Sequence, residues 1–221
     1  EDAPALVREA FQRMLSGRPR PVHLEMSPDI MGKVGSLGRR TGTQKETSHR
    51  VAIGDPTKIW WDARPHPDLG TLEIRICDMC TRIDEAIAVA ALIQALVAKL
   101  LKLRNQNQSW RIYRGMFIQE NKWRAVRYGM AGKLIDFGIG AEVPMVDLLE
   151  EILEIVDDVL DELGSREEIR YLRQIAQTGT SADRQLAVYY GALTRGATPR
   201  EALFAVVDHL IAETAEGWKL A

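Results

Sequence analysis

The sequence predicts an α+β fold in which a mainly antiparallel sheet is backed by helices and the C-terminal half of the chain is helical. Residues 71–77 alternate apolar and polar side chains, which is the pattern of a strand with one buried face. From residue 83 onward, apolar residues recur at helical spacing in several long segments, separated by glycine, proline and capping residues. Together these patterns indicate a small sheet followed by a helical region.

Composition excludes some classes of function. The chain has 221 residues, of which 46% are hydrophobic and 27% charged, and its net charge is -2. This balance is typical of a soluble globular protein and argues against a nucleic-acid binder that works by bulk positive charge. No segment reaches the ~18 uninterrupted apolar residues of a membrane span, and the N-terminus lacks a basic-then-apolar leader. We therefore expect a cytoplasmic protein with no nucleic-acid or membrane partner.

The N-terminal region predicts little structure of its own. Residues 4–16 have the apolar stripe of a short amphipathic helix, and residues 22–26 have the composition of a short strand. Residues 32–50 are rich in Gly, Arg, Lys, Ser and Thr, which is typical of a mobile linker. A helix and one strand cannot stand alone as a domain, so we expect the main domain to follow.

The polar face of the strand predicted at 71–77 carries two charged groups. Glu73 and Arg75 stand side by side there, roughly 6–7 Å apart at a rise of about 3.3 Å per residue. A carboxylate beside a guanidinium can hold a cation and steady a phosphate at the same place. The alternative is a cross-strand salt bridge on a solvated face, and the alternation alone favours this alternative.

Cys77 and Cys80 form a Cys-x-x-Cys spacing at the end of this strand. Such a pair can be half of a zinc site or a redox motif. A zinc site requires about four ligands, and the sequence has no second cysteine pair and no histidine pair. We therefore attribute this spacing to chance.

The segment after residue 80 predicts a buried helix at 83–101. Thr81 is suited to be its N-cap, with Asp84 three residues further on. The helix is apolar on almost all sides, so we expect it to pack against the strand that carries Glu73. Its longest unbroken apolar run, 86–93, has eight residues, which is too short for a membrane span.

Residues 111–127 predict a charged helix that ends at Gly129, followed by a short strand at 133–138. The spacing alone favours a ladder of salt bridges between residues four apart on this helix. Its polar side chains of interest are Glu120, Arg124 and Arg127 on one face, with Asn121 beside them.

The remainder of the chain predicts four helices. The first, at 147–163, has an apolar stripe and an acidic outer face, which we interpret as solvated and not as a metal cluster. The next three are predicted from their start signals: a capping box formed by Ser165 and Glu168, the segment 179–185, and Thr198 followed by Pro199.

Two motifs in the chain resemble a known family. The first reads Trp60-Trp61-Asp62-Ala63-Arg64-Pro65-His66-Pro67 and continues as Gly70-Thr71-Leu72-Glu73-Ile74-Arg75-Ile76-Cys77-Asp78. The second reads Glu120-Asn121-Lys122-Trp123-Arg124-Ala125-Val126-Arg127-Tyr128-Gly129. Both resemble the carboxylate–amine ligases, that is, the glutamate–cysteine ligase type 2 proteins, which are relatives of glutamine synthetase. The resemblance implies a glutamine synthetase-like antiparallel sheet and runs from about Thr47 to the C-terminus.

The resemblance also implies roles for individual residues. Glu73 would be a ligand of Mg²⁺, Arg75 would clamp the phosphates of ATP, and Arg64 would be a second positive charge. Asn121, Arg124 and Arg127 would face the substrate pocket. The implied catalytic residues are Arg75, Arg64 and Arg127, and the implied nucleotide-binding residues are Arg64, Arg75, Asn121 and Arg124. Further candidates for the substrate side are Ser181, Asp183 and Arg184.

A second resemblance concerns residues 4–31. The run Ser16-Gly17-Arg18-Pro19-Arg20-Pro21-Val22-His23-Leu24-Glu25-Met26 resembles the end of the first domain of thiamine-diphosphate-dependent enzymes. It contains none of that family's catalytic or cofactor-binding positions. We therefore predict a helix–strand segment of foreign origin at 1–35, a linker at 36–46 and the C-terminal part of a ligase-like domain at 47–221.

The ligase resemblance implies an ATP-dependent enzyme that joins a carboxylate, such as glutamate, to an amine through an acyl phosphate. It covers the C-terminal half of the family, without the Gly-x-Glu-x-Glu strand that supplies further metal ligands. The alternative is therefore a truncated, non-catalytic fragment or a self-associating interaction domain. Because exposed apolar edges favour association, we expect a homo-oligomer in either case.

Overall fold

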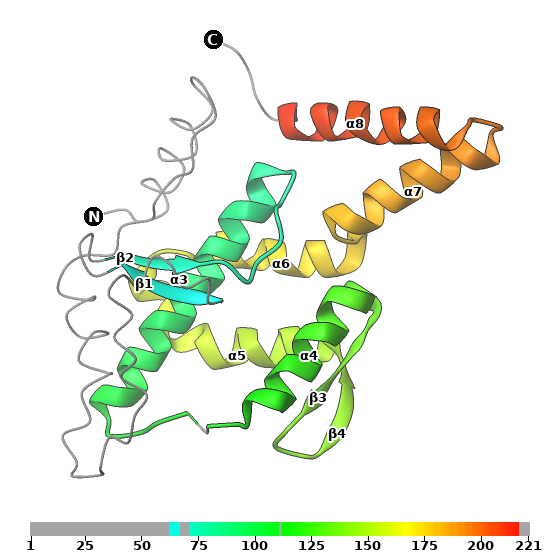
Figure 1. Cartoon of the computed structure of the whole chain (residues 1–221). Helices are drawn as coiled ribbons and strands as arrows, with labels where there is room; N and C mark the ends of the chain where they lie inside the picture. The colour runs from blue at the N-terminus through cyan, green and yellow to red at the C-terminus, as the bar shows by residue number, and fades with distance from the viewer. Residues whose placement is uncertain (1–61, 67–70, 111, 217–221) are drawn as a thin grey trace. The chain divides into compact units, whose positions relative to one another are not determined.

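The computed structural model describes residues 62–66, 71–110 and 112–216. The chain divides into two compact units between Met79 and Cys80, and each unit is described by itself. The first contains strands β1 and β2, and the second contains helices α3 to α8 with strands β3 and β4 (Figure 1). The predictions made for residues 1–61, including the domain boundaries at 35 and 46, lie outside the described residues.

Strands β1 (Ala63–His66) and β2 (Thr71–Ile74) form an antiparallel pair in which Arg64 lies opposite Glu73. The prediction that the strand extends to Cys77 is wrong. The amides of Arg75 and Ile76 both donate to the carbonyl oxygen of Asp62, at 2.8 and 3.2 Å. Because two successive amides share one acceptor, the regular alternation of the ladder stops at this point.

Helix α3 (Ile83–Asn105) is the core helix of the second unit. Ala88, Ala91 and Ala95 recur at helical spacing on one side and are at most 8% exposed. They join the buried core with side chains of α5 (Met145–Leu163) and α6 (Arg166–Thr178). Among the described helices, α3 alone is long and apolar enough to cross a membrane, a test that the core helix of a soluble protein also passes.

The start of α3 differs from the prediction. Its N-cap is Arg82 and not Thr81, and no side chain caps the first turn. The Thr81 hydroxyl is used elsewhere, because it lies 2.9 Å from oxygens of Ser181 and Glu213. Packing of α3 against the strand that carries Glu73 stays a prediction, since that strand belongs to the other unit.

A helix and a hairpin follow α3. Helix α4 (Gly115–Tyr128) ends at Gly129, where a short 3-10 turn (Gly129–Ala131) leads into β3 (Lys133–Asp136). The sequence did not indicate β4 (Ala141–Pro144), which pairs antiparallel with β3. The described strands therefore form two separate antiparallel pairs, which is compatible with an α+β fold. The larger glutamine synthetase-like sheet stays a prediction.

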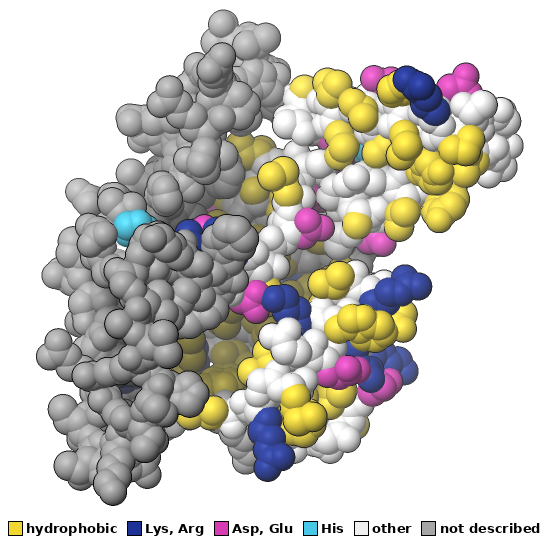
Figure 2. All heavy atoms as spheres, in the orientation of Figure 1, with side chains coloured by type: hydrophobic (Ala, Val, Ile, Leu, Met, Phe, Trp, Pro, Cys, Tyr) yellow, Lys and Arg dark blue, Asp and Glu magenta, His cyan; other side chains and the backbone are white. Residues whose placement is uncertain are grey.

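The C-terminal half is helical, as predicted. Helices α7 (Ser181–Thr194) and α8 (Pro199–Ala215) both begin with a complete capping box, formed by Thr180 with Asp183 and by Thr198 with Glu201. They form a helical pair, and hydrophobic side chains gather on its visible face (Figure 2). At least half exposed on this pair are Leu186, Tyr190, Leu203, Phe204, Val207 and Ile211.

The capping box predicted at Ser165 is wrong. Gly164, with φ 63°, ends α5, and Ser165 directly after it has φ -114° and ψ 15°, which is not the extended conformation of an N-cap that accepts a hydrogen bond. Its amide donates to the carbonyl of Leu160 at 3.2 Å, and its side chain is 1% exposed without a cap bond.

Candidate functional site

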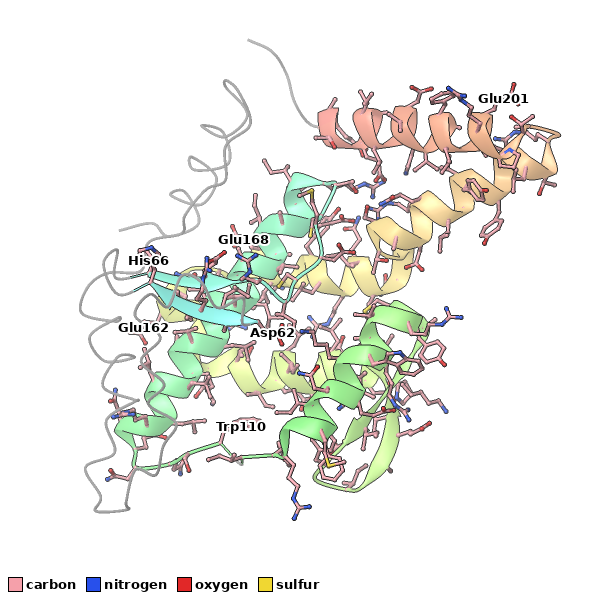
Figure 3. All side chains as sticks on the ribbon, viewed as in Figure 1. Asp62, His66, Trp110, Glu162, Glu168 and Glu201 are labelled. Atoms are coloured by element: carbon pink, nitrogen blue, oxygen red, sulfur yellow. The ribbon has the colours of Figure 1, made fainter. Side chains whose placement is uncertain are left out.

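The hairpin of β1 and β2 places one carboxylate between two guanidinium groups. Arg64 donates from Nε to Glu73 Oε2 at 2.8 Å, and its Nη2 contacts the same oxygen. Arg75 Nη1 lies 2.5 Å from the other oxygen, Oε1. The site is open to solvent to different degrees, because the side chains of Arg64, Glu73 and Arg75 are 12%, 30% and 38% exposed. Figure 3 labels Asp62 and His66 at the two ends of β1.

The charge state of Glu73 follows from these contacts. Burial by itself would raise the pKa of its carboxyl group, but the hydrogen bonds and charges of Arg64 and Arg75 outweigh it and lower the pKa. Glu73 is therefore a carboxylate at neutral pH. The cross-strand salt bridge predicted from the alternation is present, with Arg64 as its partner.

The fit of this hairpin to a divalent cation is limited. Mg²⁺ takes six oxygen ligands in octahedral order, and Glu73 supplies two oxygens that already contact guanidinium groups. Within residues 62–66, 71–110 and 112–216, no group of three or more His, Cys, Asp or Glu side chains could hold a metal ion. Cys77 and Cys80 are not joined in a disulfide. The described residues do not by themselves form a magnesium site.

The predicted site residues of α4 contact the neighbouring hairpin and one another. Asn121 Nδ2 donates to the backbone carbonyl of Ile135 at 2.8 Å, and Asn121 Oδ1 accepts from the backbone amide of Ile135 at 2.7 Å. Asn121 therefore joins α4 to β3 through two hydrogen bonds to the strand backbone. A role in binding substrate stays a prediction for this residue.

The two arginines of α4 have different surroundings. Arg124 contacts Glu120 at 2.8 Å on its own helix, as the ladder predicted, and Glu142 of β4 at 2.7 Å. The hydrogen bonds to these two carboxylates raise the pKa of Arg124. Arg127 is exposed, and its guanidinium carbon lies 5.7 Å from the ring centroid of Tyr128. It is the more accessible cation of α4.

The structure thus brings Arg64, Glu73 and Arg75 together in the first unit. Asn121, Arg124 and Arg127 share α4 in the second unit, where each has different partners. Of the further candidates, Asp183 belongs to the capping box of α7, whereas Ser181 and Arg184 belong to a buried polar cluster.

Sequence reasoning missed that cluster. It contains Glu85 and Glu213, which are 3% and 5% exposed, with Arg184 between them. The sequence offers little signal for it, because Glu85 lies in the acidic first turn of α3 and Glu213 lies in a helix that carries further charged residues. The partners could not be assigned from spacing, since Thr81 and Glu213 are 132 residues apart in the chain.

Comparison with known proteins covers both units. The model of glutamate-cysteine ligase family 2 matches residues 21–209. A protein of Herpetosiphon aurantiacus, named "Putative glutamate--cysteine ligase 2", is 52% identical over 166 residues. Proteins of the same name from Roseiflexus sp. (strain RS-1) and Solibacter usitatus are 56% and 53% identical over 167 and 171 residues.

These relatives cover 75–76% of this chain, and the chain spans 41–42% of their length. The matched region includes the hairpin with Arg64, Glu73 and Arg75 and the helix with Asn121 and Arg127. The two sequence motifs and the extent of this match lead to one conclusion: the chain belongs to glutamate-cysteine ligase family 2.

Proposed function

We propose that this chain acts as an ATP-dependent carboxylate–amine ligase of the glutamate–cysteine ligase type. The observation that carries the proposal is the pair of guanidinium groups of Arg64 and Arg75, held in place by Glu73 on a hairpin of this family. Fixed cations of this kind are what a transferring phosphoryl group requires. Glutamate is the proposed carboxylate, and the proposed compartment is the cytoplasm.

The proposed reaction has two steps. A carboxylate oxygen of the substrate attacks the γ-phosphorus of ATP, and ADP leaves, so that an acyl phosphate forms. The amine nitrogen then attacks the acyl carbon, inorganic phosphate leaves with the bonding electrons, and the nitrogen loses a proton. Arg64 and Arg75 would stabilise the charge on the phosphoryl oxygens, and Glu73 would hold both guanidinium groups in position.

Arg127 of α4 is the third proposed catalytic residue, and Asn121 and Arg124 are proposed to contribute to nucleotide binding. Exposure of Arg127 supports its role, because a side chain that is open to solvent can reach a ligand. Glu73 remains the proposed ligand for Mg²⁺. We assign no step to the metal, since the described residues offer too few ligands to hold it.

A hydroxylamine trap tests this function. The purified chain is incubated with glutamate, ATP, Mg²⁺ and hydroxylamine, which converts an acyl phosphate to a hydroxamate that forms a coloured complex with iron(III). We expect hydroxamate formation that depends on ATP and falls at least about 100-fold in Arg75→Gln, as for loss of one charge-stabilising group. Arg173→Gln is the matched control, because this arginine forms an exposed ion pair with Glu150 of α5. Absence of hydroxamate with the unmodified chain contradicts the proposal.

A second proposed function is self-association as an interaction domain. The observation that favours it is the apolar surface of the α7–α8 pair, where Phe204, Val207 and Ile211 are 51–64% exposed. Light scattering after gel filtration tests it. We expect a homo-oligomer that dissociates in Val207→Asp, and a monomer in the unmodified chain contradicts this function.

A further inference from the structure

The helical pair α7–α8 has few buried apolar side chains. Ala192 and Ala202 are the buried hydrophobic residues of the two helices, at 5% and 0% exposure. The buried core cluster of the second unit is formed by α3, α5 and α6, and the hydrophobic side chains packed against it come from the same three helices. Burial of apolar surface in that cluster therefore does not explain how α7–α8 is held.

A buried network of charges is found where α7–α8 meets the start of α3. Arg184 of α7 contacts Glu85 of α3 through Nη2 at 2.7 Å and Glu213 of α8 through Nε at 2.6 Å. Both carboxylate side chains are 5% exposed, and that of Arg184 is 13% exposed. A second guanidinium group, from Arg82, lies 2.8 Å from Glu213. Arg82 also lies 3.5 Å from the exposed Glu216, so the two buried carboxylates face two guanidinium groups.

Hydroxyl groups extend the network across the same three segments. Because an ionised carboxylate can only accept, the Thr81 hydroxyl donates to Glu213 Oε2 over 2.9 Å. The Ser181 hydroxyl at the start of α7 lies 2.9 Å from Thr81, and the Gln185 amide donates to it at 3.0 Å. Arg184 also donates to the carbonyl of Gly179, at 2.9 Å.

The members of such a network depend on one another. A buried charge is stable only beside its partners, and removal of Arg184 takes this partner from Glu85 and leaves Glu213 with the guanidinium group of Arg82 in a poorly solvated place. We propose that this network is a conformational latch, in which Arg184 holds α7–α8 on the start of α3 and its release lets the helical pair open as one unit while α3, α5 and α6 stay folded.

Hydrogen exchange of the full-length chain, followed by mass spectrometry, tests the latch. Glu213→Gln keeps the size of the side chain and removes its charge, so Arg184 and Arg82 lose their shared partner. We expect amides of α7 and α8 to exchange about 100-fold faster than in the unmodified chain, whereas those of α5 and α6 change by less than about threefold. Glu150→Gln, which breaks an exposed ion pair with Arg173, is the control and should leave α7 and α8 unchanged.

Two results would overturn the latch. The first is unchanged exchange of α7 and α8 in Glu213→Gln. The second is equal loss of protection in all helices of the second unit, because α7–α8 would then unfold only together with the core. The unmodified chain gives an independent measurement in low concentrations of urea. There the amides of α7 and α8 should exchange through an opening with a smaller urea dependence than those of α5, and equal dependence contradicts the latch.

A double variant separates charge pairing from the simple loss of contacts. If Arg184 and Glu213 interact as charges, Arg184→Gln combined with Glu213→Gln should accelerate exchange of α7 and α8 by less than the product of the two single effects. A product of independent effects would mean that the two side chains act separately, which contradicts the latch.

Discussion

The same pairing of chemical groups occurs twice in this protein, in two different environments. On the hairpin, Glu73 lies between Arg64 and Arg75 and is 30% exposed. In the helical unit, Glu213 lies between Arg184 and Arg82 and is 5% exposed. Solvent can replace a lost partner in the first case but not in the second. Burial therefore separates a site that can exchange partners with a ligand from a network that can only hold the fold.

The largest effect should come from removing one cation of the buried network, and removal of one cation of the hairpin is the comparison. Arg184→Met should lower the free energy of opening of α7–α8 by about 3 kcal/mol, because Glu85 and Glu213 both lose a buried partner. Arg64→Met should change the stability of its hairpin by no more than about 1 kcal/mol, since Glu73 keeps Arg75 and has access to water. Hydrogen exchange measured segment by segment checks both values. Equal losses of stability in the two variants would mean that burial does not distinguish the two regions.

Acid should act on the buried region through Glu213. Burial by itself would raise its pKa, but hydrogen bonds from Thr81 and Arg184 and the charges of Arg184 and Arg82 lower it below the ordinary value of 4.5. The stabilisation is therefore fully present above pH 4.5 and is lost as the pH falls through the lowered value. The charged or titratable groups that face Glu213 are Arg82, Glu85 and Arg184, with His209 and Glu216 of its own helical end.

We expect exchange of α7 and α8 to accelerate below pH 4.5, after correction for the intrinsic rate, and this acceleration to be much weaker in Glu213→Gln. An unchanged pH dependence in Glu213→Gln would assign the acid effect to another group.

The side chain of Asn121 gives a third case, in which the contacts are hydrogen bonds without charge. Asn121 makes two hydrogen bonds to the backbone of Ile135, and neither involves an ion pair. Asn121→Ala should lower the free energy of unfolding by about 1–3 kcal/mol, because the amide and carbonyl of Ile135 lose their partners. Urea unfolding measures this loss, and Asn121→Asp serves as the control that keeps an acceptor for the Ile135 amide. An unchanged urea midpoint in Asn121→Ala would mean that water replaces the two hydrogen bonds of Asn121.

The smallest effect is expected at a half-exposed ion pair. Arg173 of α6 makes a two-pronged contact with Glu150 of α5, at 2.7 to 3.0 Å, and both side chains are about half exposed. Arg173→Gln should change the free energy of unfolding by less than about 1 kcal/mol in urea. A larger loss would show that exposure does not decide the strength of these pairs.

Local signals in the sequence predicted much of the fold. The helices at 83–101, 147–163 and 199 onward were found because apolar spacing and helix starts are encoded in neighbouring residues. The helix start at Thr198, with Pro199 at the first helical position, was correct for the same reason. The cap at Thr81 was wrong because its hydroxyl has a stronger partner in Glu213, which no local rule can indicate.

The candidate site was predicted unevenly. The alternation of 71–77 placed Glu73 beside Arg75, and the family resemblance implied Arg64 as a second cation. The structure places Arg64 opposite Glu73 on the paired strand. The buried network was missed because its members come from three distant segments of the chain, and tertiary packing alone brings them together. The assigned roles in catalysis rest on family membership and stay predictions.

The central claim is that the exposed hairpin binds the phosphates of ATP, and thermal unfolding with ATP and Mg²⁺ tests it most directly. At about 100 times Kd, the ligand should add ~2.7 kcal/mol to the stability of the folded chain. We expect the midpoint to rise in the unmodified chain and in Arg173→Gln, and to stay at its ligand-free value in Arg75→Gln. An equal rise in Arg75→Gln, or no rise in the unmodified chain, would contradict a nucleotide site at this hairpin.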